Sequence, residues 1–324
     1  MYILNKNQPS KIEETTFAEL NMKESDIEEI IRSNIDLLCD DEESMLIVGQ
    51  QVKNDQNGRS DLTAIDNNGD IVLIEIKRDK KDILNRKEAF EFQAIRYAAS
   101  YATIKSADEL IQNIFAPYVE KYRSEFNQQT DLTSVEIAQR LFDKFVDANN
   151  IKDFNEHQRI ILIASEFDNQ TISAVAWLNS NQVDISCYQI CPYWLNEDVL
   201  IDIKKILPLV AYDDLYVNIE KKSILTRDRK KDITRCSLPK IDTLMDWELV
   251  QPGDILQAKG TAEEATLLPN GHVKLFDGRE ESIQKWLKGI YGWSSVQTYA
   301  FCVDQKTGKT LSELRAKYME EHQE

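Results

Sequence analysis

The stretch GRSDLTAIDNNGDIVLIEIK, from Gly58 to Lys77, decides the fold of the N-terminal part of this 324-residue chain. Residues 60–66 and 71–77 both have the composition of β-strands, and the Asn68-Gly69 pair between them readily adopts the positive φ of a tight turn. The second run is apolar on both faces, which is typical of a central strand covered on both sides. The sequence therefore predicts a β-hairpin whose second strand lies deep in a sheet.

The flanking segments continue an α/β pattern without a linker. Apolar periodicity predicts strands at 44–52, 159–164 and 183–190 and helices at 25–38, 85–103, 106–126, 133–149 and 171–178. These elements fit one mixed sheet flanked by helices. The expected fold class is therefore α/β, with a first domain at residues 1–215 that the segment 206–216 closes.

A change of charge marks the end of that domain. Residues 216–240 carry 8 Lys and Arg against 3 Asp and Glu and lack apolar periodicity, which predicts a basic linker. Residues 241–324 then alternate apolar and polar residues around Asn270-Gly271 and Asp277-Gly278 turns, with helices expected at 282–290 and 310–321. We therefore expect a small β-rich C-terminal domain.

Two charged residues interrupt the apolar strand at 71–77. Glu75 and Lys77 are two residues apart and project from the same face, and Asp61 on the neighbouring strand can approach Glu75. Two buried carboxylates at close range repel each other unless a cation lies between them. Magnesium accepts carboxylate oxygens and can also take water and phosphate, so these residues suit phosphodiester hydrolysis. A buried ion pair of Lys77 with Glu75 or Asp61 in an ordinary hairpin fits them equally well.

The string GRSDLTAIDNNGDIVLIEIKR is similar to the signature of the PD-(D/E)XK nuclease superfamily. Asp61 matches the first acid, and Glu75-Ile76-Lys77 matches the (D/E)XK element. The longer run of DIEEIIRSNIDLL, MLIVGQQV and VLIEIKR resembles NucS-type endonucleases. This resemblance implies a restriction-endonuclease-like fold with Glu28 as a third acidic metal ligand beside Asp61 and Glu75. On sequence alone, Glu28 fits the solvated side of its helix equally well.

A further pair of residues matches the Gln-x-x-x-Tyr element of RecB-like nucleases. Gln93 and Tyr97 lie one helical turn apart on one face, so both can point at the same site. The resemblance implies that they orient substrate, while Lys77 serves the attacking water and the phosphate. It also implies Mg²⁺ as cofactor, with Mn²⁺ as an alternative, and DNA as partner. Surface and core roles are the plainer alternative for Gln93 and Tyr97.

The C-terminal segment resembles the small RAMA-type domains that accompany restriction and modification proteins. The resemblance rests on Pro252-Gly253-Asp254, Asn270-Gly271 and Gly292-Trp293, among other matches. It implies DNA binding, and Trp293, with Trp286 and Tyr299, could stack on a base. The alternative is that these aromatic rings form the core of a small sheet domain.

Net charge weighs against binding of a polyanion. The chain carries a net charge of −17, and phosphate neutralisation supplies most non-specific affinity for DNA. Local basic residues offset this objection. We expect DNA contacts from Arg59, Arg78, Lys80 and Lys81, although such a run is also typical of a solvated loop and Arg59 could serve only to cap the hairpin.

The leading hypothesis is a magnesium-dependent deoxyribonuclease, in restriction or DNA repair, which the C-terminal domain directs to DNA that can carry modified bases. The first alternative is a non-cleaving DNA-binding protein or modified-base reader that keeps the nuclease fold. The second is a protein-interaction module. A cytoplasmic location without a membrane partner is expected because the sequence has no long apolar run and no signal peptide. A homodimer is left open.

Overall fold

The computed structural model describes residues 2–5, 8–54, 58–79, 82, 88–129, 131–195, 198–209 and 238–322. The chain forms two compact units. The first comprises residues 1–40, 44–208 and 293–295, and the second comprises residues 41–43, 209–292 and 296–324. Residues 216–237 of the predicted basic linker lie outside the described residues.

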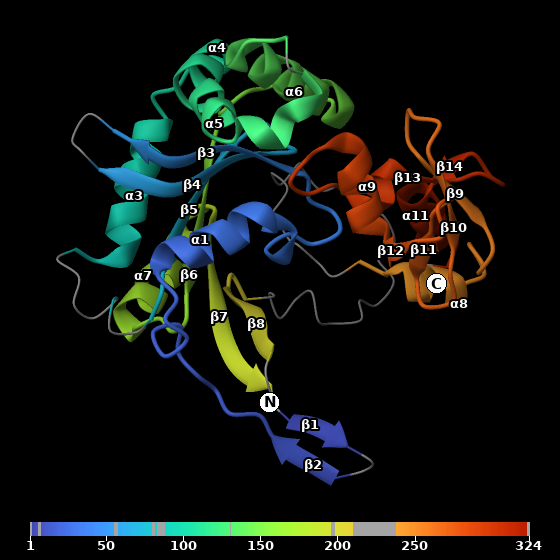
Figure 1. Cartoon of the computed structure of the whole chain (residues 1–324), viewed down its shortest axis with the longest axis horizontal. Helices are drawn as coiled ribbons and strands as arrows, with labels where there is room; N and C mark the ends of the chain where they lie inside the picture. The colour runs from blue at the N-terminus through green and yellow to red at the C-terminus, as the bar shows by residue number, and fades with distance from the viewer. Residues whose placement is uncertain are drawn as a thin grey trace, which may run out of the picture. The chain divides into compact units, whose positions relative to one another are not determined.

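A six-stranded mixed sheet forms the centre of the first unit, in the order β3-β4-β5-β6-β7-β8 (Figure 1). The strands are β3 (Met45–Lys53), β4 (Arg59–Asp66), β5 (Ile71–Lys77), β6 (Gln158–Ala164), β7 (Ile185–Leu195) and β8 (Asp198–Leu207). Strand β6 runs parallel to both β5 and β7, whereas the other neighbouring pairs are antiparallel. The sheet is thus mixed, and β5 lies inside it as predicted.

Helices flank this sheet. Those of the first unit are α1 (Glu24–Ser33), η1 (Ile35–Leu37), α3 (Phe90–Tyr101), α4 (Ala107–Leu110), η2 (Ile111–Phe115), α5 (Ala116–Lys121), η3 (Arg123–Gln129), α6 (Ser134–Asn149) and α7 (Asn169–Ser180). Helix α1 packs against β4 and β5, while α3 and α7 contact each other and pack on strands β5 to β7. Helix α5 and the π-helical turn η2 cover β3. The α/β class with a mixed sheet flanked by helices is confirmed.

The β4–β5 hairpin is closed by the turn that the sequence predicts. Gly69 has φ +86°, and a Cβ there would lie 2.4 Å from the backbone oxygen of Asp153, so the turn requires glycine. The Asp66 carboxylate accepts hydrogen bonds from the backbone N–H groups of Asn68 at 2.9 Å and Asp70 at 3.1 Å. These contacts fix the register in which β4 meets β5.

The second unit contains a separate antiparallel sheet, in the order β12-β11-β10-β9-β13-β14. Its strands are β9 (Ile255–Ala258), β10 (Glu264–Leu267), β11 (His272–Lys274), β12 (Glu280–Ser282), β13 (Cys302–Asp304) and β14 (Lys309–Thr310). Its helices are α8 (Ile241–Asp246), α9 (Ile283–Tyr291), α10 (Thr298–Phe301) and α11 (Leu311–Glu321). The expectation of a small β-rich domain with two main helices agrees with this arrangement.

Some elements differ from the sequence-based expectations. Strand β8 was not predicted, because it is an edge strand in which half of the side chains are exposed and only Leu207 is buried. The helix expected at 106–126 is divided by the π-helical turn at Ile111–Phe115. The hairpin of β1 (Tyr2–Asn5) and β2 (Gln8–Lys11) was also missed: nearly all its described side chains are exposed, so its strands lack the alternation of buried and exposed residues that marks a strand packed on a core.

None of the helices in the described part of the chain has both the length and the apolar character that a bilayer crossing needs.

Candidate metal and active site

The first predicted acid, Asp61, lies beside the strand that carries the other motif residues. Leu62 of β4 pairs with Ile74 of β5. Asp61, the residue before Leu62, therefore lies across from Glu75, the residue after Ile74. Its Oδ2 accepts a hydrogen bond of 2.7 Å from the backbone N–H of Ile76. Burial raises the pKa of Asp61 to about 6, although Lys77 opposes that shift.

Glu75, the second acid, is completely buried, with 0 % of its surface exposed. Its Oε2 accepts a hydrogen bond of 3.4 Å from Gln93, whereas its Oε1 has no hydrogen-bond partner. Burial, followed by the nearby charge of Asp61, raises the pKa of Glu75 to about 9. A carboxylate oxygen without a partner at this depth favours either a proton or a bound cation.

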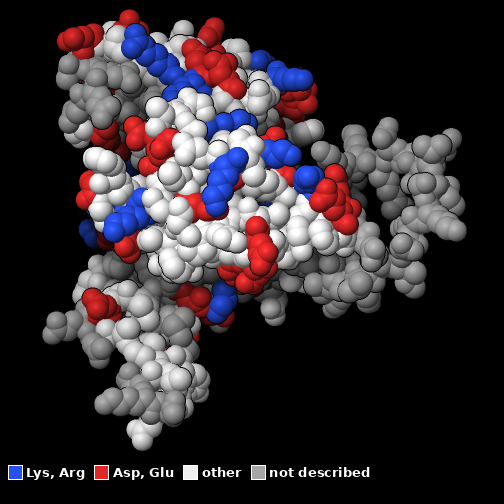
Figure 2. All heavy atoms as spheres, turned by 90° about the vertical axis from the view of Figure 1, so that its right-hand side faces the viewer, with Lys and Arg blue, Asp and Glu red and all other residues white. Residues whose placement is uncertain are grey.

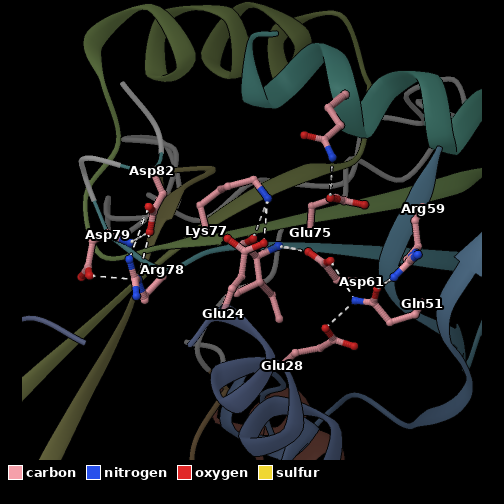
Figure 3. A network of polar contacts seen from close by, with 12 residues as sticks. Glu24, Glu28, Gln51, Arg59, Asp61, Glu75, Lys77, Arg78, Asp79 and Asp82 are labelled. Carbon is pink, nitrogen blue, oxygen red and sulfur yellow. Dashed lines mark hydrogen bonds and ion pairs between the residues drawn. The ribbon is translucent and has the colours of Figure 1, made fainter. Parts of the chain in front are cut away.

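Glu28 is buried and faces the same site from helix α1, with only 3 % of its surface exposed (Figure 3). Its Oε2 accepts a 2.5 Å hydrogen bond from Gln51, and its Oε1 has no hydrogen-bond partner. Burial and then the charge of Asp61 raise the pKa of Glu28 to about 7. The alternative that Glu28 lies on the solvated side of its helix is therefore wrong.

Gln51 links two of these acids. Its Nε2 donates to Glu28 Oε2 and, at 3.3 Å, to Asp61 Oδ1, so the amide lies between the two carboxylates (Figure 3). Its Oε1 accepts a 3.1 Å hydrogen bond from the Arg59 guanidinium. Gln51 also has φ +56°, a left-handed conformation that is uncommon for residues other than glycine. Sequence reasoning missed this residue, because a glutamine in a strand carries no motif of its own.

Lys77 pairs with an acid that the sequence analysis did not consider. Its Nζ lies 3.1 Å from Glu24 Oε1 of helix α1 and donates to the Ile76 carbonyl oxygen at 3.0 Å. Burial opposes the charged form, but the carboxylates of Asp61 and Glu24 outweigh it and raise the pKa of Lys77. Lys77 is thus held as a cation. Among the described residues, Lys77 forms its ion pair with Glu24. The alternative of an ion pair with Glu75 or Asp61 is therefore not what the structure has.

Gln93 and Tyr97 point toward the site from α3, as their spacing predicted. The Gln93 Nε2 donates to Glu75 Oε2, and lies 3.5 Å from the Tyr97 hydroxyl. That hydroxyl accepts a hydrogen bond of 3.0 Å from the backbone N–H of Arg59. Tyr97 is buried and therefore also packs in the core. The structure thus joins α3 to β4 and β5 around Glu75.

The predicted DNA-contacting residues do not form one group. The Arg59 side chain is exposed and lies beside Gln51. Arg78 instead pairs with Asp82 at 3.0 Å and Asp79 at 3.3 Å, which occupies its guanidinium (Figure 3). Lys80 and Lys81 lie outside the described residues.

The expected role of Trp293 in base stacking needs correction. Only 3 % of its surface is exposed, and its ring packs edge-on against Phe145 with the centroids 5.1 Å apart. Trp286 and Tyr299 are buried as well. All three rings are thus in the core, because their large apolar surfaces gain more from burial than from exposure.

The side chains around Glu75 suit a hard divalent cation. Glu28, Asp61 and Glu75 offer carboxylate oxygens, the ligands that Mg²⁺ prefers, and two of those oxygens have no other partner. As the side chains stand, however, no three Asp, Glu, His or Cys residues in the described ranges converge closely enough to hold an ion together. The Gln51 amide lies between two of these acids, Glu28 and Asp61.

Comparison of the chain with the models of known protein families and with curated proteins gives no match.

Proposed function

We propose that this protein is a magnesium-dependent deoxyribonuclease that hydrolyses phosphodiester bonds, with its active site around Glu28, Asp61, Glu75 and Lys77. One observation carries the proposal. Three buried carboxylates from three different elements face one site, and two of their oxygens have no hydrogen-bond partner. Such an arrangement is costly unless a cation or protons neutralise it, and strongly perturbed acids of this kind concentrate at functional sites.

The order of the residues along the chain supports a finer assignment. The first acid on one strand of a hairpin, the Glu-x-Lys element on the next strand and the Gln-x-x-x-Tyr pair on the following helix resemble the PD-(D/E)XK pattern. These residues lie on β4, β5 and α3, where Asp61 accepts a hydrogen bond from Ile76 and Gln93 donates one to Glu75. We therefore assign the first unit to the PD-(D/E)XK nucleases as part of the proposal.

Each residue has a distinct part in this reaction. Glu28, Asp61 and Glu75 would hold the divalent ion, which when bound supplies charge neutralisation and a more acidic attacking water. Lys77 is a partly buried cation beside these acids, so it stabilises the negative charge that develops on the phosphate. Gln93 donates a hydrogen bond to Glu75 and so fixes its orientation, and Gln93 together with Tyr97 would orient the substrate.

The surface charge favours a local contact with DNA over a broad electrostatic one. On the face drawn in Figure 2, Lys and Arg side chains are interspersed with Asp and Glu and do not gather into a patch of one sign. With a net charge of −17, non-specific attraction to phosphate is weak. Exposed Arg59, beside the acids, is the described basic side chain best placed to meet a phosphate.

Cleavage assays with the full chain test the proposal. Wild-type protein with Mg²⁺ or Mn²⁺ is expected to cleave at least one member of a panel of single-stranded, duplex, branched and base-modified DNA. Glu75→Gln should abolish cleavage, because the amide keeps the shape of the side chain but removes its charge. Glu91→Gln, a buried glutamate on the same helix as Gln93, serves as the control. Intact DNA across the panel with both metals would reject the nuclease.

A non-cleaving DNA-binding protein is the second candidate. It is favoured by the lack of three closely converging acidic ligands among the described residues. DNA binding that neither needs nor changes with a divalent ion, together with unchanged DNA after incubation, would support this candidate.

A further inference from the structure

The Gln51 amide lies between the carboxylates of Glu28 and Asp61. Its Nε2 carries two N–H bonds, and these point to Glu28 Oε2 at 2.5 Å and to Asp61 Oδ1 at 3.3 Å. An amide nitrogen is a donor only, so it offers two buried carboxylates a partial positive charge. These contacts place a neutral donor where two acids would otherwise face each other.

Arg59 fixes which end of the amide faces the acids. Its Nη1 donates to Gln51 Oε1 at 3.1 Å, on the opposite end of the amide from the carboxylates. The reverse orientation would place the amide oxygen against two carboxylates and its NH₂ group against a guanidinium. The chemistry of the neighbours therefore selects the observed orientation.

Gln51 reaches this position from a left-handed backbone conformation within β3. Its neighbours Gln50 and Val52 pair regularly with Leu62 and Ser60 of β4, which leaves Gln51 across the ladder from Asp61. Gln51 itself has φ +56°, which a residue with a Cβ rarely adopts unless its surroundings hold it there. The side-chain contacts to Glu28, Asp61 and Arg59 supply that hold.

We propose that Gln51 is a positioning residue that acts as an internal substitute for the metal ion. Its amide separates Glu28 and Asp61 until a divalent ion displaces it. Arg59 holds the amide in the orientation that competes with the ion. The inference rests on the proposed metal site. It explains why three acids face one site while no three of the described acidic side chains converge on a single point. A divalent ion between Glu28 and Asp61 would take the place of the amide, and a turn of the Gln51 side chain away from the acids would leave the Arg59 guanidinium available to a phosphate group.

Titration of the full-length protein with Mn²⁺, followed by the electron paramagnetic resonance signal of the free ion, tests the proposal without any measurement of activity. Gln51→Met keeps the length of the side chain but removes its donors. It should lower the Kd for Mn²⁺ by about fivefold or more, because hydrogen bonds to the two carboxylates no longer have to be broken. Gln51→Gly, which suits the positive φ, should change the Kd in the same direction.

The matched control is Gln189→Met on β7, whose Nε2 donates to the Ser165 carbonyl oxygen at 2.8 Å and contacts none of the site acids in the described structure. Its Kd should equal that of the wild type. Arg59→Met removes the donor to Gln51 Oε1 and should tighten Mn²⁺ binding by a smaller factor; an unchanged Kd would overturn the part assigned to Arg59.

The outcomes separate this inference from the proposed function. Tighter binding by both Gln51 variants supports it, since structural damage would weaken a metal site and not strengthen it. If the wild type binds Mn²⁺ and both Gln51 variants bind it with the same or a higher Kd, the inference is overturned but the nuclease proposal stands. Absence of Mn²⁺ binding from the wild type and from every variant overturns both.

Discussion

The carboxylate of Asp61 accepts a 2.7 Å hydrogen bond from the backbone N–H of Ile76, the residue between Glu75 and Lys77. This contact fixes the first acid to the strand that carries the second acid and the lysine. An asparagine oxygen can accept the same hydrogen bond, so the charge of Asp61 can be removed without loss of the contact. The site can therefore be tested separately from the fold.

Asp61→Asn is expected to weaken Mg²⁺ binding by at least about tenfold, because one of the three acidic ligands loses its charge while its backbone contact remains. Isothermal titration calorimetry of the full chain measures the change. Asp66→Asn is the control, since Asp66 is a buried acid at the other end of the same strand. Equal effects of the two substitutions would show that Asp61 has no special part in metal binding.

Lys77→Met should lower the cleavage rate by about 10²–10³-fold, the cost typical of losing one group that stabilises charge in a transition state. The Kd for Mg²⁺ should not rise, since the substitution removes a positive charge and leaves all three acids in place. Single-turnover cleavage and calorimetry measure the two quantities. Lys204→Met, on exposed Lys204 of β8, should change neither.

The central part of the fold could be predicted because its signals are local. The apolar run at Ile71–Lys77 and the Asn-Gly turn before it fix a buried hairpin strand, and a two-residue spacing places Glu75 and Lys77 on one face. The helical spacing of Gln93 and Tyr97 likewise places both toward Glu75. In each case one periodicity determines where the side chain points.

The missed features depend on contacts between elements distant in the chain. Glu24 meets Lys77 only because α1 packs on β4 and β5, and Gln51 reaches two acids only because its φ is positive. Trp293 was expected at a DNA contact, but its ring packs against Phe145, which lies 148 residues earlier in the chain. Neither the spacing nor the type of a residue reveals such a partner.

Thermal stability without metal should fall as the pH rises from about 5.5 to 8.5. Folding raises the pKa of Glu75 to about 9 and of Glu28 to about 7, from an ordinary value of 4.5. Between the ordinary and the raised value, the folded state holds more protons than the unfolded state, so the free energy of unfolding decreases with rising pH. Melting followed by circular dichroism at several pH values measures this slope.

Mg²⁺ should raise the melting temperature more at pH 8.5 than at pH 5.5, because the ion replaces protons on the same oxygens. The double variant Glu28→Gln, Glu75→Gln should show a shallower pH slope and little response to Mg²⁺. A metal-free melting temperature that rises over this pH interval, or a double variant with the wild-type slope, would contradict the assignment of the raised pKa values.

Phe276 is the best candidate for an aromatic contact with DNA in the second unit. Its side chain is fully exposed at the turn that precedes β12, whereas Trp286, Trp293 and Tyr299 are buried. Lys274 and Arg279 are near it in the sequence and are exposed as well. If the second unit binds DNA, as its resemblance to RAMA-type domains implies, a base can stack on this ring.

Phe276→Ala should then weaken DNA binding by about tenfold, since stacking of one base on an aromatic ring contributes about 1–3 kcal/mol. The melting temperature should stay at the wild-type value, because an exposed ring contributes little to the core. Fluorescence anisotropy with a labelled oligonucleotide measures the affinity, and Trp177→Ala, an exposed aromatic of the first unit, provides the control. Unchanged affinity in Phe276→Ala would rule out this ring as a contact and direct the search to the polar side chains of the second unit.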